Sequence, residues 1–478
     1  MFDNNKKTKV GLLLFATERM LGIGKGTPRG AYEERVECHA QVIVDKLRVA
    51  SDVVYDAIVY RREQVPRVIS TFYREQVDYV LAIHLGWTED FNWVRFLRDM
   101  PNVPILLASR TRDELGFSRS DTGEDDFTES MTCTNMVGAL EASGNIERIG
   151  RAMVDVCCGT LDEIIERAGV FGRAARCRSK LLSSTIGLVG TYNEVMWSTY
   201  IDPYDVFAKI GPELHFYTTP NILDELQSIP DQEVSAQCAR IYQSYELGAN
   251  IDSKKLEASV RASMAFDRLA QRFGLDCVVI NDIDPKLIGT LGLRAGFVQC
   301  SAGPAVMVPE GDIGSGIAAL ILKILGNDSI NYAEMLFIDR KGDYIAVGHA
   351  GPCDYTVQPE NCKIGNDERF ARASIRYPGA PIAWYRFPAG ERTMLHFSQG
   401  REQYKLVSAK VEALPCEHFL ATFNHGVIRP VGMKCDAFIE ALMKINVTQH
   451  YCLTPGDLTK EIAILGSMLG VNYISVNS

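Results

Sequence analysis

The chain has 478 residues, of which 46% are hydrophobic and 23% charged, and its formal net charge is −10 at pH 7. This length and composition indicate a globular protein large enough for about three domains. The acidic balance argues against nucleic acid as a partner. The longest apolar segment, near Ile317, is broken by Lys323, so no membrane span is predicted. The 13 cysteines include no CxxC pair, which favours reduced thiols in a cytoplasmic protein.

Residues 1–180 alternate between apolar runs and amphipathic segments. The run that starts at Val10 is short and lacks a small-residue cleavage site, so we interpret it as the first strand rather than a secretion signal. Further strands are predicted at 53–59, 79–84 and 103–108, with helices near 32–49, 62–76 and 88–99. This alternation predicts a Rossmann-like domain with a parallel sheet and no dinucleotide fingerprint. The polar segment 111–130 is predicted to leave the sheet as a mobile loop or an interface element.

A second α/β pattern covers residues 181–330, and a different pattern follows it. The strand IGLVG, a helix opened by Asp202 and Pro203, and the strand LHFY begin a second Rossmann-like domain. Over residues 331–478, β-rich runs follow one another without helices until about Cys435, which predicts an antiparallel sheet or small barrel. The predicted fold is α/β, with two Rossmann-like parallel-sheet domains before a mainly antiparallel, barrel-like C-terminal domain.

The stretch from Pro304 to His349 carries most of the chemistry that the sequence indicates. The apolar run AVMV ends at Pro309, and Asp312 opens a segment with the apolar spacing of one helical face. This pattern places Glu310 in a loop at the carboxyl end of a strand, where open α/β sheets bind their ligands. The nearby glycines match neither GxGxxG nor a P-loop, so a phosphate cradle is not predicted.

A predicted hairpin brings a carboxylate and an imidazole together. If residues 341–342 form a two-residue turn between MLFI and YIAV, Glu334 faces His349 with their Cβ atoms roughly 5 Å apart. With Glu310 from the nearby strand end, this pair suits a divalent metal with open coordination positions. The alternative is that Glu334 and His349 make only a surface contact.

These residues carry a resemblance to a known family. PEGDIGSGIAALILKIL followed by EMLFIDRKGDYIAVGHAG resembles the metal-binding core of the L-fucose isomerase and L-arabinose isomerase superfamily, and the similarity runs along nearly the whole chain. The resemblance implies that Glu310, Glu334 and His349 bind a divalent metal, usually manganese, and that NVTQHYCLTP supplies His450. It also implies that Glu310 and Glu334 are the catalytic acid–base pair. A homo-oligomer, trimer or hexamer, with active sites near subunit interfaces is implied as well.

The resemblance also points to substrate-binding residues. VLAIHLGW ends a predicted strand at His84, where the family has a similar strand ending in His; a packing histidine is the alternative. TNMVGALEASGNIERIG resembles a segment that reaches a neighbouring subunit's active site. Glu141 stands where L-arabinose isomerases carry His, which argues against arabinose as the substrate. Met196 and Trp197 lie in a loop that faces the substrate in fucose isomerases, where Trp197 either stacks on a sugar or packs the loop.

The expected activity is the interconversion of an aldose and a ketose through an enediolate. Mn²⁺ or another divalent cation would stabilise the enediolate, while two glutamates move protons. The monosaccharide substrate is a pentose, a deoxyhexose or an anionic (sulfonated or phosphorylated) hexose, and Arg19, Lys25 and Arg29 are candidates for recognising an anionic group. The alternatives are a metal-free sugar-binding or regulatory protein, and a metal-dependent carbohydrate epimerase or hydrolase.

Overall fold

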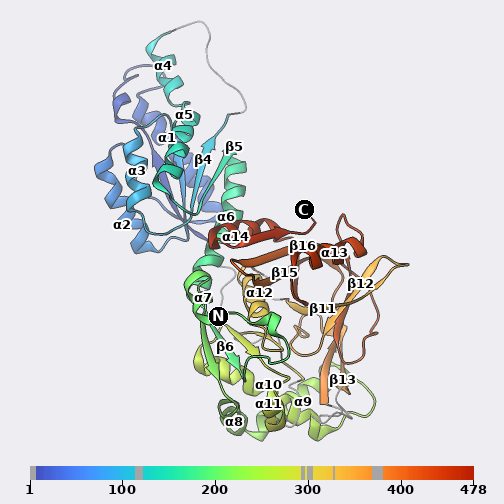
Figure 1. The fold of residues 1–478 in the computed structure, drawn as a ribbon. Coiled ribbons are helices and arrows are strands. Elements are labelled where there is room, and N and C mark those ends of the chain that lie inside the picture. The colour runs from blue at the N-terminus through green and yellow to red at the C-terminus, as the bar shows by residue number, and fades with distance from the viewer. Residues whose placement is uncertain are drawn as a thin grey trace. The chain divides into compact units, whose positions relative to one another are not determined.

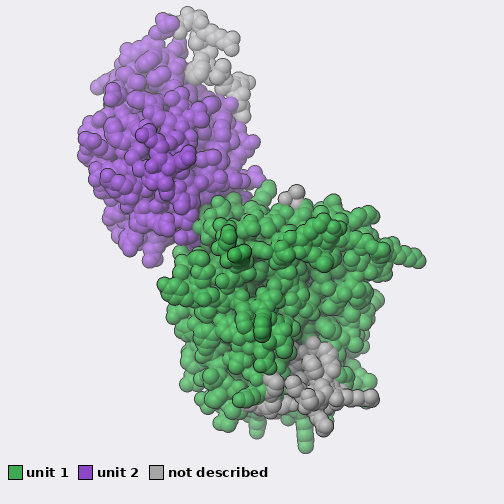
Figure 2. Space-filling model, in the orientation of Figure 1, with its two compact units in different colours: residues 1–4, 180–478 green, residues 5–179 purple. Residues whose placement is uncertain are grey.

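The computed structural model describes residues 7–112, 122–291, 296–298, 305–326, 329–368 and 380–477. Two compact units divide the chain (Figure 2). Residues 5–179 form the N-terminal unit, and residues 180–478 together with 1–4 form the C-terminal unit. Within the described residues, no helix combines the length and the apolar character that crossing a membrane requires.

A five-stranded parallel sheet forms the centre of the N-terminal unit (Figure 1). Its strand order is β2-β1-β3-β4-β5, and every pairing is parallel, as predicted. The strands are β1 (Lys9–Phe15), β2 (Asp52–Val54), β3 (Tyr79–His84), β4 (Ile105–Arg110) and β5 (Val154–Gly159). The helices are α1 (Tyr32–Ala50), α2 (Val65–Glu75), α3 (Asp90–Asp99), α4 (Glu124–Met131), α5 (Asn135–Ile149) and α6 (Leu161–Leu181), whose last residues pass into the C-terminal unit.

Apolar spacing explains how this unit forms its core. Helix α2 has a proline in its first turn and buries Val65, Val68 and Phe72, which recur at the spacing of one helical face. Strand β3 is buried along its whole length, as expected for a central strand of a parallel sheet. The predicted strand at 53–59 is shorter than expected, because only β2 pairs regularly. Residues 113–121 of the predicted excursion lie outside the described residues, and α4 follows them.

A four-stranded parallel sheet begins the C-terminal unit, as predicted. Its order is β10-β9-β6-β7. The strands are β6 (Thr185–Val189), β7 (Glu213–Tyr217), β9 (Cys277–Ile280) and β10 (Val306–Val308); the helices are α7 (Pro203–Lys209), α8 (Thr219–Ser228), α9 (Asp231–Ser244), α10 (Ser253–Phe273), α11 (Pro285–Leu291) and α12 (Ile313–Ile324). The side chains of Asp202 and Asp312 accept backbone hydrogen bonds at the starts of α7 and α12, so both predicted helix starts are confirmed.

Six antiparallel strands then close into a barrel, which confirms the barrel-like prediction. The order is β15-β18-β11-β12-β17-β16, and β16 pairs back with β15. These strands are β11 (Asn331–Asp339), β12 (Tyr344–His349), β15 (Gly390–Gln399), β16 (Tyr404–Leu414), β17 (Asn424–Pro430) and β18 (His450–Pro455). The unit also contains α13 (Cys435–Ile445), α14 (Thr459–Leu469), β19 (Asn472–Ser475) parallel to β16, and a small sheet of β8 (Glu246–Leu247), β13 (Cys362–Asp367) and β14 (Ala380–Tyr385).

The hairpin of β11 and β12 has the predicted register beside its turn, from Phe337 to Asp339, but a different register further from the turn. Its turn spans residues 340–343 rather than two residues. A β-bulge after Met335 adds one residue to β11 and shifts the pairing beyond it. As a result Glu334 faces Gly348, and the predicted pairing of Glu334 with His349 is wrong.

Candidate metal centre

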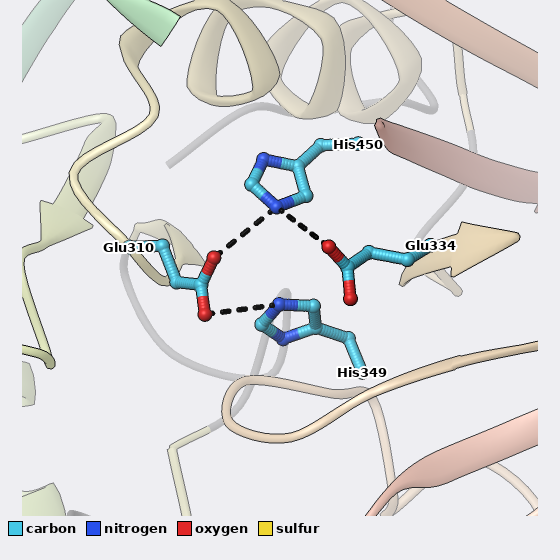
Figure 3. A group of neighbouring side chains, drawn as sticks. All are labelled: Glu310, Glu334, His349 and His450. Carbon is cyan, nitrogen blue, oxygen red and sulfur yellow. Dashed lines mark ion pairs between the residues drawn. The ribbon is translucent and has the colours of Figure 1, made fainter. Parts of the chain in front are cut away.

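Four side chains converge where the barrel meets the parallel sheet of the C-terminal unit (Figure 3). One ligand atom from each of Glu310, Glu334, His349 and His450 lies within 4.8 Å of the others. Glu310 follows β10 of the parallel sheet, whereas the other three residues belong to barrel strands β11, β12 and β18. The structure therefore brings together all four residues that the sequence resemblance implied as metal ligands.

The backbone at Glu310 is held by two neighbouring loops. Asp282, which follows β9, accepts a 2.9 Å hydrogen bond from the Glu310 amide, and Asn193, which follows β6, donates a 2.8 Å bond to the Glu310 carbonyl. Glu310 has a φ of +62°, a left-handed conformation that costs a residue other than glycine about 1 kcal/mol or more. The two hydrogen bonds hold this conformation and thereby fix where the carboxylate points.

The other carboxylate is aligned by strand pairing. Glu334 on β11 faces His450 on β18, and Glu334 Oε1 lies 3.5 Å from His450 Nε2. The same Nε2 lies 3.2 Å from Glu310 Oε2. His349 ends β12, and its Nε2 lies 3.4 Å from Glu310 Oε1. Both imidazoles thus present Nε2 to the carboxylates, and the strand partner of Glu334 is His450 rather than His349.

Each imidazole is oriented through its other nitrogen. His450 Nδ1 lies 2.8 Å from Asp312 Oδ2, and His349 Nδ1 lies 2.5 Å from the Ala350 carbonyl oxygen. A carboxylate and a carbonyl can only accept here, so Nδ1 is the donor in both rings. Nε2 is then the atom that remains to bind a cation, which is the arrangement by which proteins orient metal-binding histidines.

Aromatic and polar neighbours fix both rings further. The ring of Tyr332 lies 4.8 Å from that of His349 and 5.1 Å from that of His450, measured between centroids. His396 Nδ1 lies 2.8 Å from the His450 carbonyl oxygen and, by the same reasoning, donates to it. These contacts restrict the rotation of the imidazoles before any ligand arrives.

The charges of the cluster are strongly coupled. Burial raises the pKa of Glu310, but hydrogen bonds and charge from His349 and His450 outweigh it and hold that pKa well below its usual range. Burial lowers the pKa of His450, but its hydrogen bond to Asp312 and the nearby carboxylates of Glu310 and Glu334 raise it to about 11. The cluster therefore stabilises a positive charge at the point where Nε2 of His450 approaches the two glutamates.

The donor set and the burial fit a divalent cation. Glu310 Oε2 and His450 Nε2 are buried and lie 3.2 Å apart, but their relative orientation does not give either atom a well-directed hydrogen bond within the described part of the chain. Such buried polar atoms are costly unless a partner satisfies them, and a cation between them would do so. The side chain of Glu334 is 26% exposed while that of His450 is 0% exposed, so the centre is most open beside Glu334.

The loop after β6 carries both residues that were predicted to line a sugar pocket. The sulfur of Met196 lies 3.3 Å from Nε2 of Gln449, the residue before His450. Trp197 is 76% exposed, and its indole N–H donates to the Glu194 carbonyl. The ring is therefore not part of a buried core, and whether Trp197 stacks on a sugar or packs its own loop stays a prediction.

The remaining predicted substrate residues lie in the N-terminal unit. His84 ends β3, as predicted, and is buried, with its ring stacked on Phe15 at 5.0 Å. Glu141 lies on α5 and accepts a 2.7 Å hydrogen bond from the Trp87 indole. Both residues therefore belong to the region where the carboxyl end of β3 meets α5.

Two of the three basic residues proposed for anion recognition already form ion pairs with carboxylates. Arg19 pairs with Glu89 at 3.1 Å, and Arg29 pairs with Asp125 at 2.9 Å. Lys25 is exposed. Since carboxylates already neutralise the two arginines, they are poor candidates for holding a charged sugar.

Five residues that shape the centre were not identified from the sequence. Asp312 was predicted only as a helix cap, although it also orients His450. No pattern in the sequence pointed to the other four, because their roles depend on contacts between distant segments: Asn193, Asp282, Tyr332 and His396.

The fold and this centre define a two-unit α/β protein whose closed barrel carries a candidate divalent-metal site. No protein-family model matches the chain. It is similar to proteins named sulfoquinovose isomerase from Priestia aryabhattai and Priestia megaterium, with 23% identity over 298 residues, or 60% of this chain. The matched region spans 63% of the length of those two relatives. A sulfoquinovose isomerase from Alkalicoccus urumqiensis is 19% identical over 402 residues, covering 81% of this chain and 84% of the relative.

Proposed function

We propose that the chain is a metal-dependent aldose–ketose isomerase that acts on a sulfonated hexose. The observation that carries this proposal is the meeting of two carboxylates and two imidazoles within 4.8 Å, with both imidazoles oriented by acceptors behind them. The names of the relatives support the sugar and its sulfonate. The resemblance to the L-fucose isomerase and L-arabinose isomerase superfamily supports a cytoplasmic homo-oligomer.

The reaction sets a demanding chemical task. A proton must move between C1 and C2 of the sugar and another between the two oxygens, and a sugar C–H group is far too weakly acidic for water to do this. When bound by Glu310, Glu334, His349 and His450, a divalent cation would supply Lewis-acid stabilisation of the negative charge that develops on the sugar oxygens. Mixed carboxylate and imidazole donors suit Mn²⁺ or Fe²⁺.

Two carboxylates can divide the proton transfers between them. Glu310 and Glu334 approach the same His450 nitrogen from different segments, at 3.2 and 3.5 Å. One carboxylate would take the carbon-bound proton, and the other would move a proton between hydroxyl and carbonyl. A well-placed general base contributes about 10²- to 10⁴-fold to such a step. The low pKa of Glu310 keeps its carboxylate ionised, which is the form that binds a cation.

The proposal is tested by assaying product directly. Purified protein is loaded with Mn²⁺ and mixed with sulfoquinovose, glucose or L-fucose, and ketose formation is followed by NMR. We expect the sulfonated ketose to form from sulfoquinovose and little product from the neutral sugars, with activity lost after chelation. Absence of any ketose from a metal-loaded protein would overturn the proposal and favour a sugar-binding role.

A further inference from the structure

A second polar pocket lies in the N-terminal unit, at the carboxyl ends of strands β3 and β4. These strands are adjacent and parallel, and loops at this edge of an α/β sheet are where ligands bind. Ile83 and Leu85 line the pocket together with six polar or basic residues: His39, His84, Arg110, Arg112, Thr132 and Asn135. The described lining contains no acidic side chain, which sets this pocket apart from the metal centre.

His84 supplies an unused polar atom to this pocket. The residue is 3% exposed; its Nδ1 lies 2.8 Å from Thr88 Oγ1, and its Nε2 is buried without a partner among the described residues. Burial lowers the pKa of His84 to about 3, so the ring is neutral at physiological pH. If the Thr88 hydroxyl donates to Nδ1, Nε2 carries the proton and needs an acceptor. A ligand oxygen in the pocket would meet that need.

Arg110 supplies an unbalanced positive charge. It ends β4, is partly buried, and makes no ion pair with any described residue. Burial lowers the pKa of Arg110, and the charge of the neighbouring Arg112 lowers it further. Arg112 pairs with Glu129 at 3.1 Å, but Glu129 also pairs with Arg35 at 3.2 Å. Arg35 also pairs with Asp125 at 2.6 Å. Arg35 and Arg112 thus both have carboxylate partners, whereas Arg110 forms no ion pair with a carboxylate of the described chain.

Other groups around the pocket add to its preference for negative charge. Burial lowers the pKa of His39, and the charges of Arg110 and Arg112 lower it further, which places both guanidinium groups near this ring. Helix α5 begins at Asn135, which lines the pocket, and the N-terminus of a helix favours anions. The Asn135 side chain donates to the Arg110 carbonyl and so fixes the strand end beside the helix.

We propose that this pocket binds a compact oxyanion of the sulfonate, sulfate or phosphate class, with Arg110 and His84 Nε2 as donors. Tetrahedral oxyanions suit it because a planar guanidinium can donate two parallel hydrogen bonds to adjacent oxygens. A sulfonate carried by a sugar is one source of this chemistry, and the kinetic experiment that tests it rests on the proposed function. A free inorganic anion has the same chemistry and is distinguished by experiment.

Binding of the anion alone tests the site without reference to catalysis. Full-length wild-type protein is titrated calorimetrically with methanesulfonate and with inorganic phosphate. Arg110→Met should bind both anions about tenfold or more weakly, because it removes an arginine that donates charge-assisted hydrogen bonds. Arg110→Lys keeps the positive charge but lacks the planar guanidinium, so its affinity for the anion should lie between those of the wild type and Arg110→Met. Arg98→Met, which removes an exposed arginine of α3 in the same unit, is the matched control and should bind like wild type.

Kinetics then identify the occupant. If the sulfonate of the substrate occupies the pocket, Arg110→Met raises KM for sulfoquinovose about tenfold while kcat and Mn²⁺ affinity stay near the wild-type values. If KM is unchanged while phosphate binding is lost, the site is upheld and its occupant is a free anion. Wild-type protein that binds neither anion, or Arg110→Met and Arg110→Lys proteins that bind both as tightly as wild type, would overturn the proposal. Failure of the wild type to isomerise any sugar would instead count against the proposed function alone.

Discussion

The carboxylate of Asp312 accepts a 2.8 Å hydrogen bond from Nδ1 of His450, while the same side chain caps helix α12 through Ser315. One residue thereby links the start of a helix to an imidazole on a barrel strand. The link fixes which nitrogen of His450 faces the glutamates. It also places a second layer of negative charge behind the candidate ligand, which makes Nε2 a better donor to a cation.

Asp312→Asn should weaken cation binding without unfolding α12. Asparagine is as good a helix cap as aspartate, so the cap survives, but the charge behind His450 is lost. Loss of such a supporting partner typically costs about 10- to 100-fold in metal affinity. Calorimetric titration with Mn²⁺ measures the change. Asp252→Asn, at the N-cap of α10, is the matched control; equal Mn²⁺ affinities in the two variants would contradict the role given to Asp312.

Cation binding should stabilise the C-terminal unit against heat. A ligand that binds only the folded state at 100 times its dissociation constant adds about 2.7 kcal/mol, which corresponds to a rise in Tm of several degrees. The increase should disappear when a chelator is added. His450→Gln should abolish most of it, whereas His215→Gln, at a half-exposed histidine of β7, should retain it. A full Tm increase in His450→Gln would show that the cation binds elsewhere.

Asp267 on α10 should make stability fall as pH rises. Burial raises the pKa of Asp267 to about 6, above the value of about 3.9 in an unfolded chain. Between those pH values the folded state binds more protons than the unfolded state, so the free energy of unfolding falls with increasing pH and levels off above pH 6. Asp267→Asn should remove this slope and gain on the order of 2 kcal/mol at pH 7.

Chemical denaturation of the wild type and of Asp267→Asn at several pH values measures this slope. Asp224→Asn, at an exposed aspartate of α8, should behave like wild type. If the wild-type free energy of unfolding rose between pH 4 and pH 6 and Asp267→Asn followed the same curve, the carboxyl group would not be titrating as described.

Local sequence patterns were enough to predict most of the fold. Apolar runs alternating with amphipathic segments were sufficient for both parallel sheets, and β-rich runs without helices were sufficient for the barrel. The starts of α7 and α12 were predicted because an aspartate side chain caps a helix through contacts only a few residues apart. Information of this kind is contained within a short window of sequence.

The geometry of the centre could not be predicted in the same way. The apolar spacing does not reveal the bulge after Met335. Because of that one extra residue, Glu334 pairs with Gly348 instead of the predicted His349. The true strand partner, His450, lies on β18, far along the chain, and only the family resemblance pointed to it. Pairing between such distant strands depends on how the whole barrel closes.

The most direct test of the central claim follows a labelled hydrogen. Sulfoquinovose carrying deuterium at C2 is mixed with Mn²⁺-loaded protein, and loss of deuterium from C2 is followed by NMR. Wild-type protein should release it as ketose forms, and Glu310→Gln and Glu334→Gln should slow the release by about 10²- to 10⁴-fold. Glu412→Gln, at an exposed glutamate of barrel strand β16, should match the wild type. Undiminished release by both Glu310→Gln and Glu334→Gln would contradict the account.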